Sequence, residues 1–333
     1  MTRHRSITAI ALAAVALAAC GKKKQTVVAN TGPEDPRVSL AGGLPPTTAE
    51  APAVAPTGAL GSFAEAEAAF HAGRVEEARD YFAGYISTSP DNPWGHYMLG
   101  LSLYHQGKFG GAAKAFDRSI ELNGTNAKSF FNLGRTLLAL GRDHEAFERI
   151  EAGLILDSTS ADGLRLLARA HAKLGNIDGA LGTYRRALVL DDSDVWTLNN
   201  LGLLYLDQGN PEAAVGPLAR AVVLRGTAPI FQNNLGLALE RTGHPVSARR
   251  AYQAAVKADP TYRKAQGNLD RLSQVVSDST PSDGIVLDDL AEDFRLQIGM
   301  WKDSVPPTAV DSVAVPADSV VVPKDTVPPA MER

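Results

Sequence analysis

The sequence predicts an all-α protein: an α-solenoid of six stacked helical hairpins with a C-terminal capping helix, flanked by disordered N- and C-terminal tails. Three observations predict this fold. A glycine recurs every 34 residues, an alanine follows each glycine by five residues, and large apolar residues keep helical spacing around both. A fixed period of this length indicates stacked copies of one supersecondary unit. The glycines are Gly73, Gly107, Gly141, Gly175, Gly209 and Gly243, and the alanines are Ala78, Ala112, Ala146, Ala180, Ala214 and Ala248.

Within one repeat, the apolar residues place a helix on either side of the glycine. A leucine stands eight residues before most of these glycines, as Leu99 does before Gly107. A large apolar residue, such as Phe116, comes four residues after the alanine. Steps of three and four residues are helical spacing. Glycine accepts the positive φ that ends a helix. Each repeat is therefore expected to be two helices joined by a tight turn.

This repeat frame resembles the tetratricopeptide repeat family. The resemblance is carried by Trp94, Leu99-Gly100, Leu103, Gly107, Ala112, Phe116, and a proline at the repeat end such as Pro90 or Pro260. It implies a right-handed solenoid, residues 59–276, whose repeats are 59–92, 93–126, 127–160, 161–194, 195–228 and 229–262. Residues 263–276 are expected to form the capping helix. The first repeat departs from the pattern, and terminal repeats are often atypical because one face meets water.

Residues 1–19 are predicted to be a targeting segment that is not part of the fold. Arg3 and Arg5 give a basic start, and residues 7–19 form an apolar run too short for a comfortable membrane span. The run ends in Leu17-Ala18-Ala19-Cys20-Gly21, which resembles the lipobox of bacterial lipoproteins. That resemblance implies a lipoprotein signal peptide cut before Cys20, and lipid attachment at Cys20 through a diacylglyceryl thioether, usually with an N-acyl chain such as palmitate.

The alternative is an ordinary signal peptide in which Cys20 is incidental. Cys20 is the only cysteine in the chain, which fits an anchor and excludes an intrachain disulfide. Lipid attachment predicts a protein held on a membrane of the bacterial cell envelope and facing the periplasm. Because Gly21 is not Asp, the same resemblance favours the outer membrane. Residues 20–58 are rich in Pro, Ala, Thr and Gly, which predicts a flexible linker after the lipidated N-terminus.

Residues 277–333 are predicted to be a second tail with two parts. Residues 285–301 fit an acidic amphipathic helix. Two positions are open for this helix: on the end of the solenoid, or docked into a partner or into the protein's own groove. Beyond it, a loose repeat of Asp, Ser or Thr, Val and Pro predicts an extended, disordered tail. The apolar face of the helix carries Leu287, Leu290, Phe294, Ile298 and Trp301.

The family resemblance places a peptide-binding groove along the first helices of the repeats. Four asparagines share one place in their repeats, and a carboxamide offers both a donor and an acceptor to an extended peptide. Asparagine is also common at this place in the family, so a role in the frame itself stays open. Basic residues, among them Arg165 and Lys173, favour an acidic ligand, with Asp162 offsetting part of their charge. The predicted binding residues are Asn132, Asn200, Asn234, Asn268, Tyr97, Phe131, Arg135, Arg169 and Lys128.

No motif in the sequence points to catalysis or to a cofactor. The chain has no phosphate-binding G-x-x-x-x-G-K-[ST] loop, no G-x-S-x-G elbow and no His-Glu-x-x-His zinc motif. His71 and His105 share a place in adjacent repeats, but no third metal ligand is evident, so a packing role is favoured. The net charge of −4 gives no reason to expect nucleic-acid binding. We expect a non-enzymatic protein without cofactor or metal.

The expected function is a membrane-anchored scaffold that binds protein or peptide partners and assists the assembly of an envelope complex. Six repeats on a lipobox-bearing chain are similar in architecture to the lipoproteins that help assemble type IV pili. A second hypothesis is a regulator of envelope or cell-wall enzymes whose groove is blocked by its own C-terminal segment. A third, an enzyme or solute-binding lipoprotein with a site outside the repeats, has only the polar tail to build on.

Overall fold

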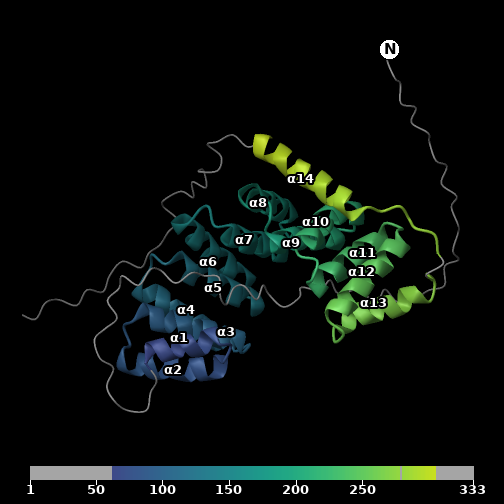
Figure 1. Ribbon diagram of the computed structural model, residues 1–333. Helices are drawn as coiled ribbons and strands as arrows, with labels where there is room; N and C mark the ends of the chain where they lie inside the picture. The colour runs from purple at the N-terminus through teal and green to yellow at the C-terminus, as the bar shows by residue number, and fades with distance from the viewer. Residues whose placement is uncertain (1–61, 278–279, 305–333) are drawn as a thin grey trace, which may run out of the picture.

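Two alternating sets of helices build an elongated solenoid (Figure 1). The computed structural model describes residues 62–277 and 280–304, and that part of the chain contains no strand. The predicted all-α solenoid is confirmed. The first helices of the repeats and the cap are α1 (Phe63–His71), α3 (Pro93–His105), α5 (Ala127–Ala139), α7 (Ala161–Lys173), α9 (Val195–Asp207), α11 (Pro229–Arg241) and α13 (Arg263–Ser273). The second helices are α2 (Val75–Thr88), α4 (Phe109–Leu122), α6 (Asp143–Leu156), α8 (Ile177–Leu190), α10 (Pro211–Leu224) and α12 (Pro245–Ala258).

Each hairpin turns at the glycine that recurs in the sequence. Gly107 has a φ of 71°, and the φ angles of all six recurring glycines lie between 71° and 82°. A side chain in this left-handed region is strained, whereas glycine is not. The turn is closed by the Lys108 N–H, which donates to the Leu103 carbonyl oxygen at 2.9 Å. This bond satisfies a carbonyl group at the end of α3 and gives the helix a defined stop.

Small residues let the two helices of a hairpin approach closely. The six recurring alanines are fully buried. A Cβ added at Gly202 would lie 2.4 Å from Leu218 Cγ, and one added at Gly134 would lie 2.3 Å from Ile150 Cγ1. Protein interiors are packed too densely to absorb such contacts without moving a helix. The small residue therefore sets the spacing between the helices of these hairpins.

The array curves toward its first helices. Successive first helices contact one another from α1 to α13, whereas successive second helices lie further apart. The first helices thus form the concave side, and the second helices form the outer side. The buried apolar residues fall into two clusters that meet in α7 and α8, the hairpin of repeat four. Across the repeat boundaries, α8 and α9 pack against each other less extensively than any other consecutive pair.

The amphipathic helix predicted after the repeats is present as α14 (Leu287–Ser304). It lies across α10 and α8, which are second helices (Figure 1). The prediction that it packs on the end of the solenoid is therefore wrong, and so is the prediction that it occupies the concave groove. The apolar face of α14 packs against apolar residues of α8 and α10, on the outer face of repeats four and five. The predicted signal peptide, Cys20, the linker before residue 62 and the tail after residue 304 lie outside the described residues.

Candidate peptide-binding face

The predicted binding residues lie on the first helices α3 to α13, but they differ in accessibility. Four of the nine are buried within the array and five are at least partly accessible. Lys128 is exposed at the start of α5. Asn132, Arg169, Asn200 and Asn268 are half-buried, whereas Tyr97, Phe131, Arg135 and Asn234 are at most 5% exposed. The accessible part of the prediction is therefore Lys128 with the four half-buried side chains.

The asparagine column joins successive first helices to one another. Each of three members donates a hydrogen bond from its amide nitrogen to a side chain on the preceding first helix, 35 residues earlier. One of the acceptors, Tyr97, is itself a predicted binding residue. The other two, Asn199 and Asn233, each precede a column asparagine directly as an Asn-Asn pair. The bonds run from Asn132 to Tyr97 (3.0 Å), from Asn234 to Asn199 (2.8 Å) and from Asn268 to Asn233 (3.0 Å).

Asn200 is the member of the column that keeps its donors available. Its oxygen accepts from Asn199 Nδ2 at 3.4 Å. Its own amide nitrogen donates no hydrogen bond within the described residues. One helical turn earlier, the indole N–H of Trp196 is buried without an acceptor. Trp196 also packs edge-on against Phe231 of the next repeat, with 5.0 Å between ring centres. The half-buried Asn200 amide thus offers hydrogen-bond donors on the α9 segment of the concave face, and a peptide carbonyl is the chemistry that matches them.

A chain of ion pairs crosses the concave side in repeats three and four and reaches the start of α9. Arg135 Nη2 lies 2.9 Å from both carboxylate oxygens of Asp162, and Arg165 also donates to Asp162. Arg165 Nε is 3.4 Å from Asp194 Oδ2. Both arginines are at most 5% exposed. Their charges are balanced inside the protein, so the acidic-ligand preference predicted from them loses much of its basis.

The Asp162 carboxylate is the centre of this chain. Burial raises its pKa, but Arg135 and Arg165 together outweigh that effect and hold the pKa below its usual value. The carboxylate therefore stays ionised at neutral pH and keeps both guanidinium groups in place.

Aromatic side chains form the N-terminal part of the same face. The rings of Trp94 and Tyr97 are stacked, with 4.7 Å between their centres and an interplanar angle of 16°. Tyr97 also meets Phe116 edge-on at 5.8 Å. Burial raises the pKa of Tyr97 to about 12, so its hydroxyl stays protonated while it accepts from Asn132. Trp94 is half-buried and offers a flat apolar surface beside the polar column.

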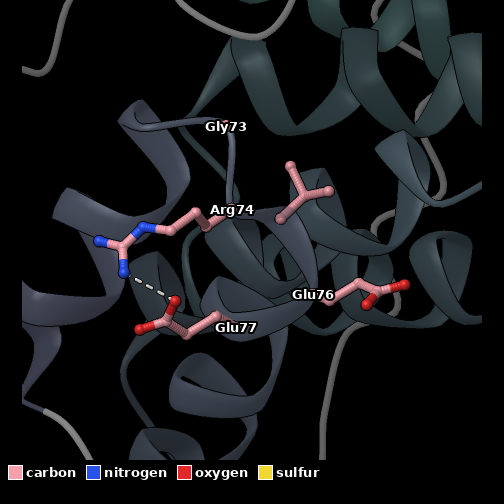
Figure 2. A pocket seen from close by; sticks show the side chains of 5 residues that line it. Gly73, Arg74, Glu76 and Glu77 are labelled. Atoms are coloured by element: carbon pink, nitrogen blue, oxygen red, sulfur yellow. Dashed lines mark hydrogen bonds and ion pairs between the residues drawn. The ribbon is translucent and has the colours of Figure 1, made fainter.

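His71 and His105 pack against an aromatic ring, and one surface depression lies at the first hairpin turn. The rings of His71 and His105 both pack against Phe70, at 6.1 and 5.7 Å. Burial, followed by the charge of Arg135, lowers the pKa of His105. Nowhere in residues 62–277 or 280–304 do three His, Cys, Asp or Glu side chains gather as metal ligands. Figure 2 shows a depression at the turn between α1 and α2, where Arg74 Nη1 pairs with Glu77 Oε2 at 2.7 Å and Glu76 points away from this pair.

Comparison with family models decides the identity of the fold. A model described as "Tetratricopeptide repeat" matches residues 49–93, 97–161 and 199–263, and one described as "TPR repeat" matches residues 168–209. The chain belongs to the tetratricopeptide repeat family. Proteins of this family bind peptide or protein partners in the groove of the array, and they are generally non-catalytic scaffolds. The resemblance seen in the sequence is confirmed.

Solved structures share this fold at low sequence identity. A chain of the APC/C hetero-tetramer Cut9-Hcn1 is 19% identical with a TM-score of 0.57, over 63% of this chain and 42% of that one. The protein TTC0263 from Thermus thermophilus is 20% identical with a TM-score of 0.50, over 55% of this chain and all of that one. PilF from Pseudomonas aeruginosa is 19% identical with a TM-score of 0.50, over 64% of this chain and 93% of that one. No curated protein matches the sequence.

This protein therefore spans less than half of the Cut9-Hcn1 chain that it matches. At these identities the likeness concerns the fold of the tetratricopeptide repeats alone. The part of the chain that the structure describes contains no helix with both the length and the apolar character needed to cross a membrane.

Proposed function

We propose that this tetratricopeptide repeat protein is a non-enzymatic scaffold of the bacterial cell envelope that binds protein or peptide partners along its concave face and assists the assembly of an envelope complex. The observation that carries the proposal is the concave face itself. It runs without interruption from α3 to α13, and the only helix outside the repeats and their cap among the described residues, α14, lies on the opposite side. No helix among residues 62–277 and 280–304 therefore covers this face.

The side chains on this face fit an extended peptide bound mainly through its backbone. Asn200 supplies amide donors that a peptide carbonyl can accept. Trp94 gives an aromatic surface on which an apolar side chain packs. Lys128 places an exposed cation at the start of α5. Because Arg135 and Arg165 are already paired with carboxylates, charge contributes less to the selection of a ligand than shape and backbone hydrogen bonds do.

Site-specific photo-crosslinking in intact cells tests the concave face. A photoreactive residue in place of Lys128 or Asn200 is expected to form adducts with the same partner, since both positions face one continuous surface. Lys114, exposed on the outer side of α4, is the matched control and should not form that adduct. Adducts that are identical from Lys128 and Lys114 would contradict binding on the concave side. An enzymatic activity retained by the purified chain would contradict the scaffold role.

The membrane anchor is the second part of the proposal, and it is supported by the lipobox-like Leu17-Ala18-Ala19-Cys20-Gly21. Two or more acyl chains hold a protein stably on a bilayer, at about 0.8 kcal/mol per buried CH₂ group. In bacterial cells fed labelled palmitate, the wild-type chain and the Lys22→Ala variant should incorporate the label. Cys20→Ser should not, because a hydroxyl cannot form the thioether. Label in Cys20→Ser, or none in the wild type, would reject lipid attachment at this residue.

A further inference from the structure

The outer face of repeats four and five has a composition that the other repeats lack. At the place two residues after the recurring alanine, these two repeats carry glycine, whereas the other repeats carry a charged residue. The residue directly before this glycine is a leucine in repeat four and a valine in repeat five. The residues at the first place are Asp80, Lys114, Glu148, Gly182, Gly216 and Arg250, and the apolar neighbours in repeats four and five are Leu181 and Val215. The result is a smooth apolar strip across α8 and α10.

The apolar face of α14 fills this strip. A Cβ added at Gly216 would lie 3.1 Å from the Phe294 ring, so a larger residue there would push Phe294 away. Ile298 is fully buried, and Ala291 and Phe294 are nearly so. Trp301 packs edge-on against Phe294 at 5.7 Å between ring centres. The contact is that of a helix bound in a groove by residues spaced three and four apart.

Polar contacts hold both ends of the segment that carries α14. Before the helix, the Asp283 carboxylate accepts from the Ser247 backbone N–H at 2.8 Å and from the Ser247 hydroxyl at 2.5 Å, at the start of α12. At the far end, Lys302 Nζ lies 3.2 Å from Asp192 Oδ2, just after α8. The Arg185 guanidinium lies 5.4 Å from the centre of the Trp301 ring. These contacts fix both the direction and the register of α14.

The position of α14 coincides with the weakest boundary in the array. The α8–α9 boundary joins repeats four and five, and its helices pack less extensively than those of the other boundaries. By contacting α8 on one side of this boundary and α10 on the other, α14 bridges the two repeats (Figure 1). Since each repeat of a solenoid is held only by its neighbours, a bridge of this kind limits how far the boundary can open.

We propose that α8 and α10 form a helix-binding groove on the outer face, that α14 is its intramolecular ligand, and that α14 thereby holds repeats four and five at a fixed angle. This second site is separate from the concave face, and it recognises an amphipathic helix instead of an extended peptide. It does not depend on the proposed envelope function.

Gly216→Arg in the full-length chain tests the groove without a truncation. Arginine already occupies the equivalent place in repeat six as Arg250, so the substitution is compatible with a second helix of this repeat. It should displace Phe294, and amide exchange in α14 and at the α8–α9 boundary should rise by roughly ten-fold, while α3 to α6 keep their protection. Gly110→Arg, at an exposed glycine of α4 with nothing within 4 Å of its Cβ position, is the matched control. Persistent protection of α14, or release of α14 without faster exchange at the α8–α9 boundary, would overturn the proposal.

A binding experiment measures recognition directly. In full-length Phe294→Asp/Ile298→Asp, α14 should leave the groove, and a fluorescein-labelled synthetic peptide of residues 283–304 should then bind saturably. Adding Gly216→Arg to this variant should weaken binding by roughly ten-fold or more, and adding Gly110→Arg should not. The wild-type chain should bind the peptide more weakly because its groove is already filled. Circular dichroism checks that the variants stay helical. Failure of the helical variant to bind the peptide, or binding that Gly216→Arg leaves unchanged, would refute a specific groove.

Discussion

Phe231→Ala is expected to lower the free energy of unfolding by about 3–5 kcal/mol, the range for truncating a buried phenylalanine. Phe231 is fully buried in α11 and packs edge-on against Trp196 of α9. Its loss would leave a cavity at the boundary between repeats five and six. Urea denaturation followed by circular dichroism measures the change.

The position of the damage is as informative as its size. Because repeats are coupled only to their neighbours, amide exchange should accelerate in α11 to α13 before it changes in α3 to α6. Phe109→Ala is the matched control. Because Phe109 is only half-buried at the start of α4, this substitution should lower the free energy of unfolding by less. An equal loss from both variants, or uniform acceleration along the whole chain, would show that the boundary between repeats five and six is not where Phe231 acts.

Asp162→Asn is expected to destabilise the protein by about 2–3 kcal/mol at neutral pH. Breaking a fully buried ion pair costs roughly 3–5 kcal/mol. The figure is reduced here because the Asp162 side chain is 43% exposed, although Arg135 beneath it is 2% exposed. The variant keeps the shape of the side chain but leaves Arg135 and Arg165 without the charge that they share. Urea denaturation again gives the difference, with Asp178→Asn, on the exposed first turn of α8, as the control.

The effect of Asp162 should depend on pH in a defined direction. The arginines outweigh burial and hold the pKa of Asp162 in the folded protein below its unfolded value of about 3.9. The carboxylate therefore contributes its full stability above the unfolded pKa, and that contribution is lost as pH falls through the folded pKa. The gap between wild type and Asp162→Asn should be constant near neutrality and shrink below about pH 4. A gap that stays constant down to acid unfolding would contradict the ion-pair account.

The arrangement of the binding face could be predicted from sequence only in part. The column of Asn132, Asn200, Asn234 and Asn268 was visible because its members recur at one place in the repeat. Its hydrogen bonds were not, because they depend on how far apart two first helices lie. When α9 and α11 pack together, the Asn234 amide nitrogen donates a hydrogen bond to the Asn199 side-chain oxygen, so this donor is used inside the protein. Asn200 keeps its donors, and no pattern in the sequence distinguishes it from the others.

The position of α14 could not be predicted for a related reason. Leu287, Phe294 and Ile298 show from their spacing that the helix has an apolar face, but an apolar face does not specify its partner. Gly182 and Gly216 stand at a place that is charged in the other repeats, but that difference alone does not indicate a bound helix. The role of Gly216 follows from the structure, in which the Phe294 ring packs against it.

The helices, the hairpin turns and their 34-residue period follow from patterns in the sequence. These features depend on forces between residues close in the chain: three- and four-residue apolar spacing, and the positive φ of Gly107 and its equivalents. The availability of polar groups on the concave face and the binding position of α14 depend instead on tertiary packing. Arg135 meets Asp162 across 27 residues, and Lys302 meets Asp192 across 110. Contacts over such distances follow from the packing of whole helices, which no local pattern encodes.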